Sequence, residues 1–356
     1  MSFEFKRVDP QTVREEVVNF FWQQRHWPGD TIDDYYKMWD WRYRALSDGP
    51  PLVYIAKVKD TGELVGHIGI YRLNFRCGDV DLKFCVPGNL FVHPDWQKNI
   101  IGARLAMFVR TLVESREFDA VLAFGNPNAN TMFLRLGFTE LGAMHTYVDV
   151  RDAGPLLRRR LGALTVVAPL INASFAVHRG WSRRGGAHRT PARVRRLTAD
   201  EFLLLDRSHW APPSRLVSWD SNQYVVERYL REPDTERHLY GLFKSNSSLL
   251  EGFVVTEPTS RLKVWDCQTN SATISPPDAI NAVVEHREDA ETVLVPTLPQ
   301  SDLAQDFVRA GFFDRRSVDS TETTTFLSAY SSRNNTHADI LGNQRRWSIW
   351  LGSRHY

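Results

Sequence analysis

The chain has 356 residues, of which 42% are hydrophobic and 24% are charged, and its net charge is +2 at neutral pH. This composition is globular and long enough for two domains with separate cores, and it excludes disordered, collagen-like and coiled-coil classes. The small net charge makes a nucleic-acid partner unlikely on electrostatic grounds.

Three scattered cysteines, Cys77, Cys85 and Cys267, have neither the even number of a disulfide framework nor the spacing of a zinc site. We therefore expect a reducing, cytoplasmic location and no metal. The N-terminus lacks the apolar segment of a signal peptide. The longest uncharged stretch, residues 161–177, contains helix-breaking residues and is short for a bilayer crossing, so we expect it to be buried or interfacial, with no membrane span.

The first 150 residues alternate between strand-like and helix-like patterns, which predicts an α/β layer with a partly parallel sheet. Apolar residues recur on one face of the segment 101–118, and Gly137 is a natural helix stop. In chain order we predict strands at 5–8, 53–58, 64–73 and 84–94 (the last broken at Pro87-Gly88), a helix at 101–118, a strand at 120–124 and a helix at 128–136.

The two halves of the chain share landmarks with the same spacing, which indicates an internal duplication. In both halves, eleven residues separate the first tyrosine from the second, and twelve more lead to a glycine. The landmarks are Arg42-Tyr43, Tyr54 and Gly66 in the first half, and Arg228-Tyr229, Tyr240 and Gly252 in the second. Each half also opens with a basic-apolar strand and closes with a helix that runs into a glycine. The alternative is that unrelated strands and helix ends look alike.

A basic segment separates the two copies, because residues 151–196 contain eleven arginines and a single acid, Asp152. We therefore predict a domain at 1–150, an arginine-rich linker at 151–192 and a second domain at 193–356. Two interpretations of the linker stay open. The arginines are either a solvated arm with charges at helix C-termini, or a contact for an anion such as a nucleotide, a phosphate or a membrane surface.

Residues 90–105, LFVHPDWQKNIIGARL, join a predicted strand to the long helix through a short turn. This segment resembles the GNAT superfamily of acyl-CoA-dependent N-acyltransferases, in which Q/R-x-x-G-x-G/A opens that helix. Gln97, Gly102 and Ala103 match the pattern, while Ile100 stands where a glycine is usual.

A second match is the closing pattern N-x-x-A-x-x-x-F-x-x-L-G-F at residues 126–138. Together the two motifs span about 50 residues, and the flanking strands extend the resemblance over residues 1–150. It implies an α/β fold (an α+β mixed sheet) of two tandem GNAT-like domains. Each would be a mostly antiparallel sheet with a splayed parallel pair, flanked by helices.

The resemblance implies that the turn binds the pyrophosphate of acetyl-CoA or another acyl-CoA, and the physical chemistry agrees. A helix N-terminus offers unpaired N–H groups and a partial positive charge. The expected cofactor-binding residues of the turn are Gln97, Lys98, Asn99, Ile100, Ile101, Gly102 and Ala103. By resemblance, the strand Leu90-Phe91-Val92 would bulge and bind the pantetheine arm, one of its N–H groups would polarise the thioester, and Asn126 would contact the cofactor.

The chain departs from the family at two positions that commonly move protons. Val121 stands where a carboxylate on a central strand is usual, and Phe133 stands where a tyrosine is usual. A base must therefore come from elsewhere if one is used, although positioning alone supplies much of the acceleration. The candidates are His145, His67 and Asp81; for each, the alternative is a purely structural role.

The second copy lacks the anion-binding turn, because Pro276-Pro277 stand where amides would be needed and proline has no N–H. We expect a degenerate domain that binds no coenzyme and completes the acceptor cleft. The predicted function is N-acylation of a small-molecule primary amine, with an amino sugar, free or nucleotide-linked, as the favoured acceptor. The alternatives are a non-catalytic binding module, or a transferase that takes its acyl group from a carrier protein or a charged tRNA.

Overall fold

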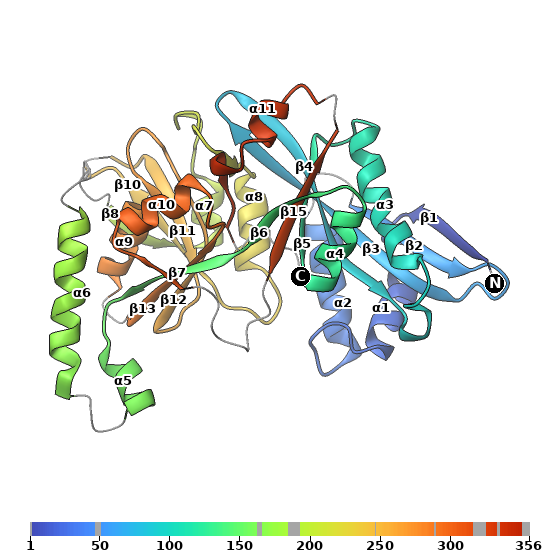
Figure 1. The fold of residues 1–356 in the computed structure, drawn as a ribbon, viewed down its shortest axis with the longest axis horizontal. Coiled ribbons are helices and arrows are strands. Elements are labelled where there is room, and N and C mark those ends of the chain that lie inside the picture. The colour runs from blue at the N-terminus through green and yellow to red at the C-terminus, as the bar shows by residue number, and fades with distance from the viewer. Residues whose placement is uncertain are drawn as a thin grey trace.

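The computed structural model describes residues 2–46, 51–161, 166–183, 193–245, 247–287, 290–315, 325–332 and 335–350. Two β-sheets lie side by side, and helices cover the faces of both (Figure 1). This arrangement confirms the predicted fold class of two mixed sheets flanked by helices.

The first sheet has the strand order β1-β2-β3-β4-β5-β15-β6. Its pairs are antiparallel except for β4 and β5, which are parallel. Two short strands, β9 and β16, extend it beside β3. The members are β1 (Phe3–Val8), β2 (Leu52–Val58), β3 (Leu64–Cys77), β4 (Val80–Val92), β5 (Ala120–Gly125), β15 (Phe326–Ser331), β6 (Thr139–Ala143), β9 (Leu216–Ser218) and β16 (Trp347–Ser348).

The second sheet has the order β14-β7-β13-β12-β11-β10-β8, with β12 and β13 as its parallel pair. Along each of these two strand orders, one parallel pair therefore lies among antiparallel neighbours, as predicted; the short strands β9 and β16 of the first sheet are also parallel to each other. The members are β7 (His145–Val150), β8 (Arg193–Leu197), β10 (His238–Phe243), β11 (Leu250–Thr256), β12 (Arg261–Thr269), β13 (Thr292–Thr297) and β14 (Phe313–Arg315).

The two sheets exchange a strand. β7 from the first half inserts between β13 and β14, and β15 from the second half inserts between β5 and β6 (Figure 1). The boundary predicted at residue 150 therefore falls after a strand that belongs to the other sheet. Sequence patterns could not show this, because a strand looks the same whichever sheet it joins.

Helices pack on both faces of each sheet. In the first half, α1 and α2 share a core with one face, whereas α3 and α4 share a core with the other. In the second half, α9 and α10 cover one face and α7 lies on the other. The bounds are α1 (Arg14–Gln23), α2 (Ile32–Asp40), α3 (Ile101–Glu114), α4 (Pro127–Arg135), α7 (Ala199–Leu203), α8 (Asn222–Val225), α9 (Pro276–His286), α10 (Asp302–Arg309) and α11 (Ala338–Leu341).

The strand register supports the duplication seen in the sequence. Gly66 of β3 lies opposite Ala56, two residues after Tyr54, and Gly252 of β11 lies opposite Leu242, two residues after Tyr240. The opening strands match as well, since Arg7 of β1 pairs with Tyr54 and Arg196 of β8 pairs with Tyr240.

A rare helix type recurs at the paired Arg-Tyr landmarks. Arg42-Tyr43 lies in the π-helix η1 (Trp41–Ala45), and Arg228-Tyr229 lies in the π-helix η4 (Val226–Leu230). Because π-helical turns are uncommon and concentrate at functional positions, their recurrence at the same landmark argues against a chance likeness of the two halves.

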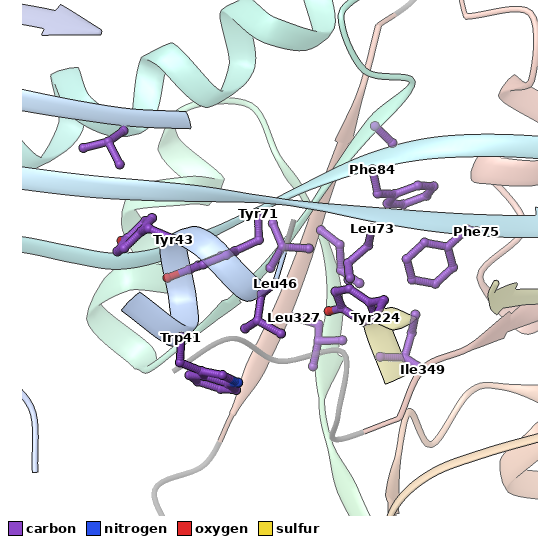
Figure 2. Packing of buried hydrophobic residues seen from close by; sticks show 14 of the residues in the cluster. Trp41, Tyr43, Leu46, Tyr71, Leu73, Phe75, Phe84, Tyr224, Leu327 and Ile349 are labelled. Atoms are coloured by element: carbon purple, nitrogen blue, oxygen red, sulfur yellow. The ribbon is translucent and has the colours of Figure 1, made fainter. Parts of the chain in front are cut away.

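The largest apolar core crosses from one half to the other. Tyr224, Leu327 and Ile349 of the second half pack in the same cluster as Leu73 and Phe75 of the first (Figure 2). Burial of such side chains stabilises each by roughly 1.5–3 kcal/mol, so the two halves contribute to each other's stability.

The described part of the arginine-rich linker contains two helices, α5 (Gly154–Leu161) and α6 (Ala168–Arg183). Phe175 and His178 of α6 pack their rings on Phe313 of β14. Of the linker, residues 162–165 and 184–192 lie outside the described residues. Within the described chain, no helix is both long and apolar enough to cross a bilayer.

One local prediction was wrong. Strand β4 does not break at Pro87-Gly88, because Pro87 lies opposite Ile70 and Gly88 lies opposite Gly69 within the ladder. Pairing of β4 with β5 ends at Cys85, so no hydrogen bond to β5 is lost because Pro87 has no N–H. The irregularity comes one residue later, at Asn89.

Candidate active site

The two parallel strands at the centre of the first sheet separate. β4 and β5 pair only through Phe84 with Ala120 and Cys85 with Val121, and the ladder then stops. The remaining lengths of both strands leave a V-shaped opening, as the resemblance implied. A similar short pairing, Arg261 to Lys263 with Thr292 to Leu294, occurs in the second sheet.

A β-bulge lies on β4 at the mouth of this opening. His67 pairs with Phe91 and Gly69 pairs with Gly88, so β4 carries one residue more than β3 across this interval. Asn89 has a φ of +52° there, a left-handed conformation in which asparagine is tolerated better than most residues. The bulge turns the backbone of Asn89 and Leu90 out of the regular ladder.

The side chain of Asn89 is held by hydrogen bonds from three elements. Its Oδ1 atom accepts from the indole N–H of Trp27 at 3.0 Å, and its Nδ2 atom donates to the hydroxyl oxygens of Tyr71 at 2.7 Å and Tyr43 at 3.4 Å. Below it, Nδ1 of His67 lies 3.0 Å from the carbonyl oxygen of Asn89. Because the whole network is buried, the bulge is fixed before any ligand binds.

A cavity of about 1240 Å³ opens beside the bulge, and both halves of the chain line it. The first half contributes the loop 26–30 before α2, the β4 segment 87–90 and the start of α4. The second half contributes residues 232–237 and 257–259. Since the V-shaped opening and both halves meet here, this cavity is the candidate acceptor site.

Among the charged side chains that line the cavity, acids outnumber the two arginines, Arg42 and Arg237; His26 also lines it. The acidic residues are Asp30, Asp34, Glu232, Asp234, Glu236 and Glu257. Burial, followed by the charge of Arg42, lowers the pKa of His26 to about 4. His26 is therefore neutral at pH 7 and keeps a lone pair that can accept a proton.

The turn before α3 presents free amides, as predicted. The first N–H bonded into the helix is that of Arg104, to the carbonyl oxygen of Ile100, and no described backbone carbonyl accepts from Ile101, Gly102 or Ala103. No side chain caps this N-terminus. Three N–H groups thus point out of the helix start, which is the requirement for binding a pyrophosphate.

The exposure of these three residues differs: Gly102 and Ala103 are half-buried, whereas Ile101 is completely buried. Lys98, Asn99 and Ile100 are exposed, and Ile100 has an ordinary φ of −74°, so its position does not require glycine. A Cβ atom on Gly102 would lie 3.6 Å from Val92 and 4.0 Å from Met132, which places the turn between the end of β4 and α4.

The other predicted cofactor residues follow the strand toward the cavity. Leu90 and Asn126 line the cavity, and the ring of Phe91 packs at a tilt against that of His26 with 4.4 Å between ring centroids. The Nε2 atom of Gln97 donates to the carbonyl oxygen of Val92 at 3.2 Å, tying the turn to the strand. The Oδ1 atom of Asn126 caps α4 by accepting from the N–H of Ala129, so only its Nδ2 group could serve a ligand.

The structure does not bring His145, His67 and Asp81 together. His145 begins β7 in the second sheet and pairs with Asp314 at 3.0 Å. Asp81 lies near the β3–β4 turn in an ion pair with Arg76, and its side chain is 65% exposed. Neither residue lines the cavity.

His67 lies next to the site but behind the bulge. It is completely buried, and burial lowers its pKa to about 3. Its Nε2 atom lies 3.5 Å from the hydroxyl of Tyr43, so both ring nitrogens face groups that hold Asn89. This geometry suits a residue that supports the bulge.

The two departures from the family pattern differ in consequence. Val121 is completely buried in the core beneath α3, whereas Phe133 lines the cavity. Phe133 cannot donate a proton to a leaving group. The neutral imidazole of His26 and the acidic lining are the proton-accepting groups that the cavity does contain.

The corresponding helix start in the second half has no free amide in its first turn. Pro276 and Pro277 are the first two residues of α9, and the N–H of Asp278 donates to the hydroxyl of Ser275. The end of the chain also occupies this region, since Ser348 and Trp350 line the small cavity between β12 and α10.

Sequence reasoning missed His26, Trp27 and Asn89. A signal for the first two was available in the W-P-G-D turn after α1, which ends a helix at the place where an acceptor loop would begin. An asparagine after Pro87-Gly88 could also have indicated a left-handed bulge residue. The acidic wall from the second half had no sequence signal, because it depends on how the halves pack.

Residues 14–138 match the Acetyltransferase (GNAT) family. This region of the chain is therefore similar to GNAT acetyltransferases. The GNAT match covers the splayed strands, the bulge and the free helix start, and it ends just after Gly137. No curated protein sequence matches the chain.

The solved structures that are similar to this chain resemble most of its length, and not residues 14–138 alone. A probable N-acyltransferase from Enterococcus faecalis V583 is 9% identical over 93% of this chain and 72% of its own, with a TM-score of 0.57. GCN5-related N-acetyltransferases from Anabaena variabilis and Kribbella flavida are 11% and 15% identical. They cover 91% and 92% of this chain and 72% of their own chains, with TM-scores of 0.54 and 0.51. At such identities the likeness establishes the fold.

Proposed function

We propose that the protein transfers an acetyl or short acyl group from acyl-CoA to a primary amine. The observation that carries the proposal is a continuous arrangement within the region that matches the GNAT family. Free amides at α3, the splayed strands and the bulge at Asn89 lead to a cavity that both halves enclose. A bound acyl-CoA would supply the thioester that the amine attacks.

The chain's own groups suit that reaction. The amides of Gly102 and Ala103 would hold the pyrophosphate, and the backbone of the bulge would orient the acyl carbonyl and stabilise the charge that develops on its oxygen. The amine nitrogen forms a bond to the carbonyl carbon while the carbon–sulfur bond breaks. The proton that the amine loses would pass to His26 or to a cavity carboxylate, and the thiolate leaves and takes up a proton.

The acidic lining supports an amine as the acceptor. Asp30, Asp234 and Glu236 are exposed at the cavity and create a negative potential that raises the local concentration of an ammonium ion. An amino sugar, free or nucleotide-linked, is the acceptor class that we propose. The second half would act by enclosing this acceptor.

Calorimetric titration with acetyl-CoA, joined to a thiol-release assay against a panel of amines, tests the proposal. Gly102→Glu would place a carboxylate among the free amides, whereas Gly102→Gln adds the same bulk without charge; space for a Cβ exists there. We expect a 10- to 100-fold weaker affinity for acetyl-CoA in G102E than in G102Q, as for the loss of a charge-assisted contact. Absence of binding at millimolar acetyl-CoA in the unmodified protein would falsify the proposal.

A non-catalytic binding module is the second candidate, favoured by Val121 and Phe133, which cannot move protons. It predicts binding of acetyl-CoA with no turnover of any amine. The third candidate takes its acyl group from a carrier protein or a charged tRNA held by the arginine-rich linker. It predicts salt-sensitive binding that is lost when Arg158, Arg159 and Arg160 are neutralised; the side chains of Arg159 and Arg160 lie outside the described residues.

A further inference from the structure

Arg42 is a buried cation without a counter-charge. Its side chain lines the cavity, and only 5% of the residue is exposed. Its Nε atom has no hydrogen-bond partner among the described residues, and none of their carboxylates lies within 4.0 Å of the guanidinium. The rings of Trp27 and Trp41 lie beside it, with each ring centroid 5.5 Å from the guanidinium carbon. A buried charge without a partner destabilises the folded protein unless a ligand of opposite charge pairs with it.

The equivalent arginine of the second half is neutralised internally. Arg228 lies in the second π-helix, directly before the landmark Tyr229 as Arg42 lies before Tyr43, and it pairs with Glu232, four residues later, at 3.3 Å. Glu232 also pairs with Arg237. The residue four positions after Arg42 is Leu46, which is apolar and buried. The duplicated position thus keeps its arginine in both halves but keeps an internal carboxylate only in the half without the cofactor turn.

The acids around the cavity are engaged elsewhere or lie at its exposed edge. Asp34 caps α2 and pairs with Lys37, and Glu257 accepts from the indole N–H of Trp265. Asp30, Asp234 and Glu236 are exposed to solvent. The cavity therefore has a negative edge and one uncompensated positive group in its buried lining. This distribution suits a ligand that carries charges of both signs.

We propose that Arg42 binds a carboxylate or phosphate group of the acceptor, so that the acceptor is an amine that also carries an anion. That the ligand is the acceptor rests on the proposed function. That the ligand carries an anion rests on Arg42 alone. A guanidinium matches both anions because its N–H groups form a fork that binds two oxygens at once. Arg42 lines the cavity, and the neighbouring rings of Trp27 and Trp41 cannot accept a strong hydrogen bond from this fork.

Thermal unfolding in inorganic phosphate, compared with chloride at equal ionic strength, tests the anion site without turnover. The variants are Arg42→Met, Arg42→Lys and the control Arg44→Met, which removes an exposed arginine of the same π-helix. Phosphate at the α3 N-terminus contributes equally to all of them, so differences isolate Arg42. We expect phosphate to raise Tm less in R42M than in the unmodified protein and in R44M, with R42K between them.

The Tm values in chloride alone give a second test of the proposal. R42M no longer buries an uncompensated charge, so its Tm should exceed that of the unmodified protein. A merely structural arginine would give a lower Tm on substitution. An equal phosphate shift in R42M and the unmodified protein would overturn the proposal. If R42M does not fold, the same comparison between R42K and the unmodified protein decides the question.

The acceptor side is tested with glucosamine and glucosamine 6-phosphate as a matched pair, using acetyl-CoA. We expect kcat/KM to be about 10- to 100-fold higher for the phosphorylated amine, and this ratio to disappear in R42M while R44M retains it. A preference for succinyl-CoA over acetyl-CoA that R42M removes would assign the anion to the acyl group and overturn the acceptor assignment. If no amine is acylated but the phosphate shift depends on Arg42, the proposed function fails and the anion site stands.

Discussion

The indole N–H of Trp27 donates a 3.0 Å hydrogen bond to Oδ1 of Asn89, joining the loop before α2 to the bulge of β4. One side-chain contact thus connects a wall of the acceptor cavity to the backbone that would orient the thioester. The conformation of the bulge and the shape of the cavity are coupled through it.

Two substitutions of Asn89 separate the contribution of its side-chain hydrogen bonds from that of its left-handed backbone conformation. Asn89→Gly keeps the left-handed backbone and loses the three side-chain hydrogen bonds, which predicts a loss of about 2–3 kcal/mol in the free energy of unfolding. Asn89→Ala loses the same bonds and also strains the backbone, so it should be roughly 1 kcal/mol less stable than N89G. Urea unfolding measures both values. Equal stability of the two variants would show that the positive φ carries no strain.

The buried histidines predict a loss of stability in mild acid. The folded-state pKa of His26 is lowered to about 4 and that of His67 to about 3, whereas an unfolded histidine titrates near 6.5. Between about pH 6.5 and 4 the unfolded chain therefore binds more protons than the folded chain. As the pH falls through this range, each histidine lowers the free energy of unfolding by up to about 1.4 kcal/mol per pH unit.

Unfolding in urea at a series of pH values measures this slope. His26→Gln should reduce the slope between pH 6.5 and 4, and His209→Gln, which changes an exposed histidine, should leave it unchanged. A slope that is the same in H26Q and the unmodified protein would mean that His26 titrates normally.

The second half should not bind coenzyme even when the side chain of Trp350 is removed from the cavity between β12 and α10. Trp350 is 2% exposed and packs on Phe307, so Trp350→Ala should cost about 3–5 kcal/mol. Acetyl-CoA should nevertheless bind at one site per chain in both proteins, because Pro276 and Pro277 offer no N–H. Calorimetric stoichiometry checks this expectation, and a second site in W350A would contradict it.

The exchanged strands predict that the two halves cannot be separated. A chain cut after residue 183 leaves the first fragment without β15, which normally lies between β5 and β6. Fragments 1–183 and 193–356 should aggregate when produced alone and should co-purify when produced together, because each exposes unpaired strand edges. Soluble, cooperatively unfolding fragment 1–183 would show that β15 is dispensable.

Local patterns and the resemblance accounted for most elements of the first half. The long helix at Ile101, the free amides of its first turn and the stop at Gly137 followed from residues next to one another in sequence. The cavity could not be predicted in this way. His26 and Glu236 lie more than 200 residues apart, and only the packing of the two halves brings them to the same cavity.

The sheet to which β7 belongs could not be predicted from the sequence, for a related reason. Residues 145–150 fall within the domain that the sequence predicted at 1–150, yet they form a strand of the other sheet. Their partners Thr292–Thr297 are separated from them by more than 140 residues, and nothing in a strand's pattern specifies its partner at that distance.

The position of β15 sets the order in which the protein can mature during translation. The strands from β1 to β6 leave the ribosome before β15, and the gap between β5 and β6 stays open until Phe326–Ser331 is synthesised, about 180 residues after β6. While those residues are being synthesised, the nascent N-terminal half must hold an incomplete sheet. Chaperone dependence is therefore an expected trait of this topology, as for other proteins whose contacts join distant parts of the sequence.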